Sequence, residues 1–160
     1  MKKNNSIRLY NVMFPIWFFM FLPALWLVIL PVNFGVDSLV LMLSAKRQGL
    51  EDRKALWKKH ILPVWGVGFL SDLLGAALLI PIYILIAESP LVDTWMNPIF
   101  FPGSVIMAIP GVILAGWLIY ILNKKLTFRK SQLDPAVIRK LCLHLALWTA
   151  PYTMLIPLYF

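Results

Sequence analysis

Two aspartates within otherwise apolar stretches, Asp37 and Asp72, are the residues of this sequence best suited to chemistry. Their surroundings are alike, because Phe34-Gly-Val-Asp37-Ser-Leu39 and Phe69-Leu-Ser-Asp72-Leu-Leu74 share the pattern F-x-x-D-x-L. A charged side chain at the centre of a bilayer costs roughly 3 kcal/mol on insertion scales, so such acids normally face a bundle interior or water and mark ion or proton pathways. Our candidate binding site for a cation or a proton therefore consists of Asp37, Asp72, Asn33, Ser38 and Ser71.

Three other interpretations of the two acids stay open at this point. Each carboxyl could simply accept a hydrogen bond from a neighbouring helix, or Asp37 could lie at the outer surface in a turn. A more remote alternative is an aspartic intramembrane protease, in which paired carboxyls share a proton. Gly35-Val-Asp37 is only a fragment of the G-x-G-D signature of those proteases, and Phe69-Leu-Ser-Asp72 lacks it.

Other enzyme classes find no support in the sequence, which has no H-E-x-x-H, Walker, G-x-S-x-G or dinucleotide-binding motif. Cys142 is the single cysteine, and His144 and His60 lie far apart in the chain, too few ligands for a structural zinc site. We therefore expect no catalytic residue, no metal and no cofactor.

The composition assigns the chain to the membrane class. Of its 160 residues 61% are hydrophobic, and the mean hydropathy is +0.80; soluble domains are about 45–50% apolar. We expect an all-α, polytopic helical bundle that forms a single domain over residues 1–160.

The net charge of +8 follows from the membrane topology rather than from nucleic-acid binding, which we do not expect. All fifteen Lys and Arg residues fall in three clusters that flank apolar runs, as the positive-inside rule predicts for cytoplasmic loops. The expected cytoplasmic loops are 46–60 and 123–140, and such loops can bind anionic lipid headgroups or a partner protein. The basic residues of the first loop are Lys46, Arg47, Arg53, Lys54, Lys58 and Lys59.

Three apolar segments, 61–87, 104–122 and 141–160, are long enough to cross a membrane core of about 30 Å. The stretch 88–103 has two acids and no Lys or Arg, and we expect it to be an external loop.

The N-terminal part is expected to cross twice, because basic clusters flank both of its ends. A first segment over 9–30 leaves only 31–45 for the return, so the second segment should be short and discontinuous, with an unwound turn at 31–35 that contains Pro31 and Gly35. This gives five segments in a multi-pass protein of the cell membrane, with the N-terminus cytoplasmic and the C-terminus outside. The alternative has four helices, the first of them long and bent. A signal peptide is disfavoured, because the apolar run is too long and no A-x-A site follows it.

Residue counting places the two acids at similar depth. Asp37 lies nine residues before Lys46 and Asp72 twelve after His60, or about 14 and 18 Å along a helix. Small residues that allow close helix packing are expected at Gly68, Gly75, Gly111 and Ala115.

The leading hypothesis is a small transporter or channel, or a membrane subunit of a transport complex, that moves a cation or a cation-coupled solute through Asp37 and Asp72. A chain this short favours a homo-oligomer or a larger complex. The alternative is a non-catalytic scaffold or anchor that binds a partner protein through its basic loops.

Overall fold

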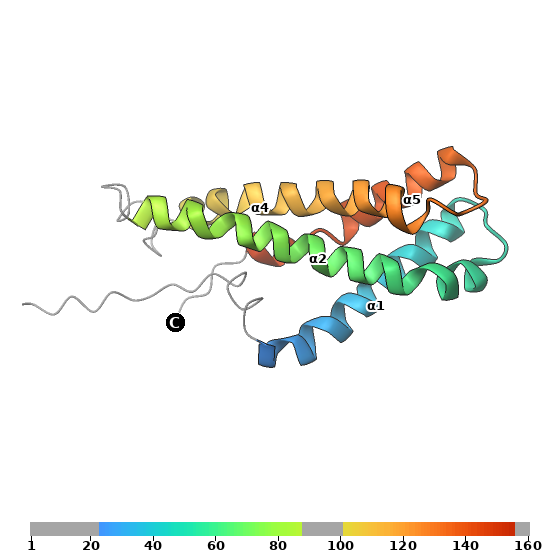
Figure 1. Ribbon diagram of the computed structural model, residues 1–160, viewed down its shortest axis with the longest axis horizontal. Coiled ribbons are helices and arrows are strands. Elements are labelled where there is room, and N and C mark those ends of the chain that lie inside the picture. Colours follow the sequence, from blue (N-terminus) through green and yellow to red (C-terminus); the bar gives the residue numbers. More distant parts are fainter. Residues whose placement is uncertain (1–22, 88–100, 156–160) are drawn as a thin grey trace, which may run out of the picture.

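The computed structural model describes residues 23–87 and 101–155, and all regular structure within these two ranges is helical (Figure 1). The described residues form four α-helices and two shorter helices. The shorter ones are the π-helix η2, Asn123–Thr127, and the 3-10 helix η3, Tyr152–Leu155. The α-helices are α1, Pro23–Arg47; α2, Arg53–Ala87; α4, Phe101–Leu122; and α5, Pro135–Trp148.

Within the described residues, three helices are long and apolar enough to cross a membrane, in agreement with the expected membrane class. The candidate spans are Trp26–Arg47, Arg53–Leu85 and Val105–Thr127. Helix α5 has 14 residues, or about 21 Å, and is too short to cross a core of about 30 Å by itself.

The unwound turn predicted at 31–35 is wrong, and so is the separate short segment over 31–45. Helix α1 runs without interruption from Pro23 through Pro31 to Arg47. Membrane helices tolerate an internal proline, because neighbouring groups can satisfy the carbonyl that it leaves free. Gly35 is also helical, and Gly49 is the one glycine with positive φ among the described residues. Residues 9–22 of the predicted segment 9–30 lie outside the described residues.

The interruption of a helix occurs instead in the last predicted segment, 141–160. The helix begins earlier, at Pro135, where the Asp134 side chain accepts a hydrogen bond from the backbone N–H of Ala136 at 2.6 Å. It ends at Trp148, and η3 follows after a three-residue break. Pro151 explains the break, since it has no N–H to continue the helix; the Tyr152 hydroxyl donates to the carbonyl oxygen of Leu147 at 2.7 Å in its place.

The other predicted boundaries also shift. The expected loop 46–60 is mostly helical, because α2 begins at Arg53, and 123–140 contains η2 and the first turns of α5. Helix α4 covers the predicted segment 104–122. Most of the predicted external loop, 88–100, lies outside the described residues.

Helix α2 is the centre of the bundle and contacts both α4 and α1 (Figure 1). The crossing with α4 is close, since a Cβ atom built on Gly75 would lie 2.5 Å from the carbonyl oxygen of Gly111 and 3.0 Å from the Cβ atom of Ala115. The N-terminal end of α1 diverges from the bundle (Figure 1), although the Trp65 indole N–H donates to the carbonyl oxygen of Leu30 at 3.1 Å.

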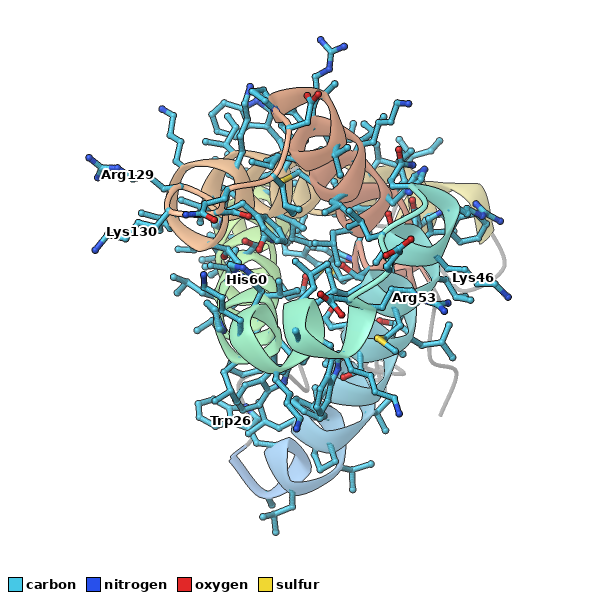
Figure 2. All side chains as sticks on the ribbon, turned by 90° about the vertical axis from the view of Figure 1, so that its right-hand side faces the viewer. Trp26, Lys46, Arg53, His60, Arg129 and Lys130 are labelled. Atoms are coloured by element: carbon cyan, nitrogen blue, oxygen red, sulfur yellow. The ribbon has the colours of Figure 1, made fainter. Side chains whose placement is uncertain are left out.

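The basic residues of both predicted loops gather at one end of the bundle. Figure 2 looks onto this end and shows Lys46 and Arg53 on one side and Arg129 and Lys130 on the other. The chain reaches it four times, at the end of α1, the start of α2, the end of α4 and the start of α5 (Figure 1). We call this end the basic end.

Candidate functional site

Two clusters of buried apolar side chains fill the bundle, and the two aspartates lie between them. The cluster near the basic end includes Leu41, Ile61 and Leu145. The cluster farther away includes Ala76 and Ala150. The polar residues of the site lie on α1, α2 and α5, next to the residues of these clusters along each helix. The two carboxyls are therefore inside the bundle, with apolar packing on at least one side.

Asp37 and Asp72 line one small cavity, together with Asn33, Val36, Gly68 and Thr149. The side chains of the two acids are 4% and 6% exposed, and the carboxyls are close enough to interact electrostatically. The cavity volume is about 20 Å³, which matches one water-sized particle rather than an organic solute.

A glycine of α2 makes room for the carboxyl of α1. A Cβ atom at Gly68 would lie 3.2 Å from Oδ2 of Asp37, so any larger side chain at this position would press on the acid. Gly68 was expected to allow close helix packing, and the atoms that a Cβ atom there would meet within 4 Å are those of the Asp37 side chain on α1.

The end of α5 completes the site. Thr149 is the residue that terminates this helix, and its hydroxyl donates to the carbonyl oxygen of Leu145 at 2.8 Å. The same hydroxyl is in hydrogen-bonding contact with the Asp37 carboxyl.

The electrostatics of the site favour a positive charge. The C-terminal end of a helix carries a partial negative charge of about half an electron, and the end of α5 brings it to the two carboxyls. No Lys or Arg occurs in residues 9–45 or 60–123, so the membrane parts of α1, α2 and α4 offer no compensating cation. Oδ1 of Asp72 is buried and has no hydrogen-bond partner among the described residues.

The structure brings together three of the five residues that the sequence proposed. Asn33, Asp37 and Asp72 share the cavity, whereas Ser38 and Ser71 are not part of its lining. Ser71 donates its hydroxyl to the carbonyl oxygen of Val67 within the same helix at 2.7 Å. The Ser38 hydroxyl is buried without a partner among the described residues.

Thr149 is the site residue that sequence reasoning missed. The available signal was Pro151 two positions later, since a proline inside an apolar segment can end a helix and expose its last carbonyls. A proline at this position can equally kink a continuous helix, and nothing in the sequence shows which helix end faces the acids.

A second group of buried polar atoms lies at the junction of α4 and η2. The Asn123 amide donates to the carbonyl oxygen of Ile119 at 2.9 Å, while its own oxygen and the Thr127 hydroxyl are buried without partners among the described residues. Nearby, the His60 ring donates to the backbone carbonyl of Thr127 and lies 4.9 Å from the centre of the Phe128 ring. Among the described residues, no group of three or more His, Cys, Asp or Glu side chains could hold a metal ion.

Comparison with known proteins does not assign a family. The chain matches no protein-family model, and neither the curated proteins nor the solved structures include a match.

Proposed function

We propose that this protein binds a cation at the Asp37–Asp72 site and takes part in moving it across the membrane. The observation that carries the proposal is the pair of buried carboxyls on α1 and α2, in a chain that has no Lys or Arg in residues 9–45 or 60–123. Two carboxyls that lack a protein counter-charge are stable in this setting only with bound protons or a bound cation.

The size and make-up of the site favour the proton or a small monovalent cation. A cavity of about 20 Å³ accepts one water-sized particle, and the lining provides two carboxyls, an amide and a hydroxyl. A helix that ends inside the bundle and turns its carbonyls toward a cation is a device of secondary transporters. In support of this comparison, helix α5 ends at Trp148, and its C-cap residue Thr149 lines the cavity.

The orientation follows from the charge distribution. We place the basic end in the cytoplasm, in accordance with the positive-inside rule, and we propose the cell membrane as the location. Residues 1–22 and 156–160 lie outside the description, so a cytoplasmic N-terminus and an external C-terminus stay predictions.

We also propose that the chain works as part of an assembly, either a homo-oligomer or a transport complex. Three candidate spans and one short helix are few to enclose a translocation path within one chain. Large apolar side chains are left exposed on α1, α2 and α4, including Leu27 at 81%, Ile113 at 65% and Leu85 at 69%. In a membrane these residues can face either lipid or another subunit.

The test is cation flux in proteoliposomes that contain the purified full chain. A pH-sensitive dye and sodium flux, each measured under an imposed gradient, distinguish a proton from a metal cation. We expect Asp37→Asn and Asp72→Asn to reduce the flux at least tenfold. Thr149→Val should also reduce it, while Thr149→Ser should restore it because serine keeps the hydroxyl.

Ser71→Ala is the matched control for Asp72→Asn. Ser71 is adjacent to Asp72 and completely buried, but its hydroxyl is bonded within α2 and does not line the cavity. We expect this variant to keep the wild-type flux. If the two asparagine variants also keep it, the carboxyls are structural and the transport proposal is refuted.

A second candidate function is a scaffold that binds an acidic partner at the basic end. The observation in its favour is that no Lys or Arg of the described residues forms an ion pair with an acid, although the Lys124 ammonium lies 5.8 Å from the centre of the Tyr120 ring. Charge reversal at Lys54 and Lys58 should then release a co-purifying protein. Retention of every co-purifying protein by this double variant would exclude the scaffold.

A further inference from the structure

A groove between α1 and α5 is separate from the cation site. Its volume is about 240 Å³, and no residue that lines it also lines the cavity at Asp37 and Asp72. The side chains along it include Leu39, Leu43, Arg47, His144 and Trp148.

The groove is polar at one end and apolar at the other. At the basic end it contains Arg47 and a hydrogen bond of 2.6 Å between the Ser44 hydroxyl and Nδ1 of His144. Deeper in the membrane it is formed by Leu39, 59% exposed, and Trp148, 65% exposed. From Arg47 to Leu39 the groove follows α1 over eight residues, or about 12 Å.

The change from polar to apolar along the groove matches a phospholipid of the leaflet at the basic end, whose headgroup is polar and whose acyl chains point into the membrane. The phosphate would lie at the level of Arg47, which forms no ion pair among the described residues and is exposed. An arginine side chain can donate two parallel hydrogen bonds to a phosphate. An acyl chain would continue past Leu43 to Trp148, where α5 ends and the chain turns away at Pro151.

We propose that this groove binds one anionic phospholipid, with the phosphate on Arg47 and an acyl chain between α1 and α5. The charge distribution favours a lipid over a second copy of the chain as the occupant. Copies inserted in the same direction have their basic ends on the same membrane face, so an interface at this groove would bring Arg47 and Lys46 of both copies together.

The experiment is native mass spectrometry of the full chain, released from detergent after incubation with phosphatidylglycerol or phosphatidylcholine. We expect one phosphatidylglycerol to be retained, at least fivefold more tightly than phosphatidylcholine. Arg47→Gln should weaken its binding about fivefold, the effect of one basic residue near an anionic surface. Leu43→Trp and Leu39→Trp, which fill the apolar part, should abolish the retained lipid.

Two control variants separate a bound lipid from general attraction to the basic end. Lys58→Gln removes an equal charge from the exposed start of α2, and Leu62→Trp adds the same bulk at a side chain that is 64% exposed and outside the groove. Both should retain the lipid as the wild type does. Because Leu39 is more exposed than Leu43, its tryptophan variant tests the groove even if Leu43→Trp does not fold.

Several outcomes would overturn the proposal. Equal retention of both lipids by the wild type would do so, as would equal weakening by Lys58→Gln and Arg47→Gln. A dimer that the groove-filling variants dissociate would assign the groove to a second copy. Failure of lipid binding with intact cation flux would leave the cation site standing, because the two sites share no lining residue.

Discussion

The close crossing of α2 and α4 gives a quantitative test of the helix packing next to the proposed cation site. A Cβ atom added at Gly75 would lie 2.5 Å from the carbonyl oxygen of Gly111, a backbone atom that cannot rotate away. Ordinary contact begins at 3.4 Å, so Gly75→Ala requires the two helices to separate by 0.9 Å at this point (3.4 − 2.5).

Two opposing effects set the size of the loss. Forcing an extra carbon into a close-packed interface typically costs about 1–3 kcal/mol. Alanine has a better helix propensity than glycine, which returns up to about 1 kcal/mol. We expect Gly75→Ala to lower the free energy of unfolding by about 1–2 kcal/mol.

The assay is reversible unfolding in mixed micelles of a mild detergent and dodecyl sulfate, followed by circular dichroism. Gly66→Ala is the control, because Gly66 lies in the same helix and a Cβ atom there has nothing within 4 Å. This variant should be as stable as the wild type or slightly more stable. Equal stability of the two alanine variants would show that the helices are not in contact at Gly75, and the reasoning would fail.

Three further predictions concern the site, the α1–α5 contact and the basic end. Gly68→Ala should leave the unfolding free energy nearly unchanged but lower the cation flux several-fold, because its Cβ atom would lie 3.2 Å from Oδ2 of Asp37 in a cavity of about 20 Å³. Ser44→Ala should cost about 0.6 kcal/mol in the same unfolding assay, the average for a hydrogen bond between membrane helices, since it removes the bond to His144. Phe128→Ala should cost about 3–5 kcal/mol, because this side chain is 1% exposed and fills the apolar cluster at the basic end.

Each of these has a result that contradicts it. Normal flux in Gly68→Ala would mean that the glycine does not limit the carboxyl. A loss above 2 kcal/mol in Ser44→Ala would show that the hydroxyl does more than bond one histidine. A Phe128→Ala variant of near wild-type stability would mean that the segment after η2 does not pack against the bundle.

Composition and charge alone predicted the membrane class, because apolar runs of this length are typical of membrane-spanning helices, and three described helices fit that prediction. The clustering of Lys and Arg likewise predicted that the two basic segments lie at the same end, since both flank such runs. Counting residues from these clusters put Asp37 and Asp72 at similar depth, and the shared cavity agrees with that depth. All of these inferences depend on distance along the chain, which a helix converts directly into distance in space.

Only the tertiary structure decided which of the apolar helices is interrupted. Pro31 and Pro151 are both prolines in apolar segments, yet α1 continues through the first and α5 has already ended three residues before the second. Each proline removes one backbone hydrogen bond of its helix, so the local pattern does not distinguish the two positions, and the difference arises only in the packed bundle. For the same reason Thr149 could not be assigned to the site in advance: it reaches Asp37 because α5 ends beside α1, and a contact between residues 112 positions apart (149 − 37) is fixed by packing rather than by local pattern.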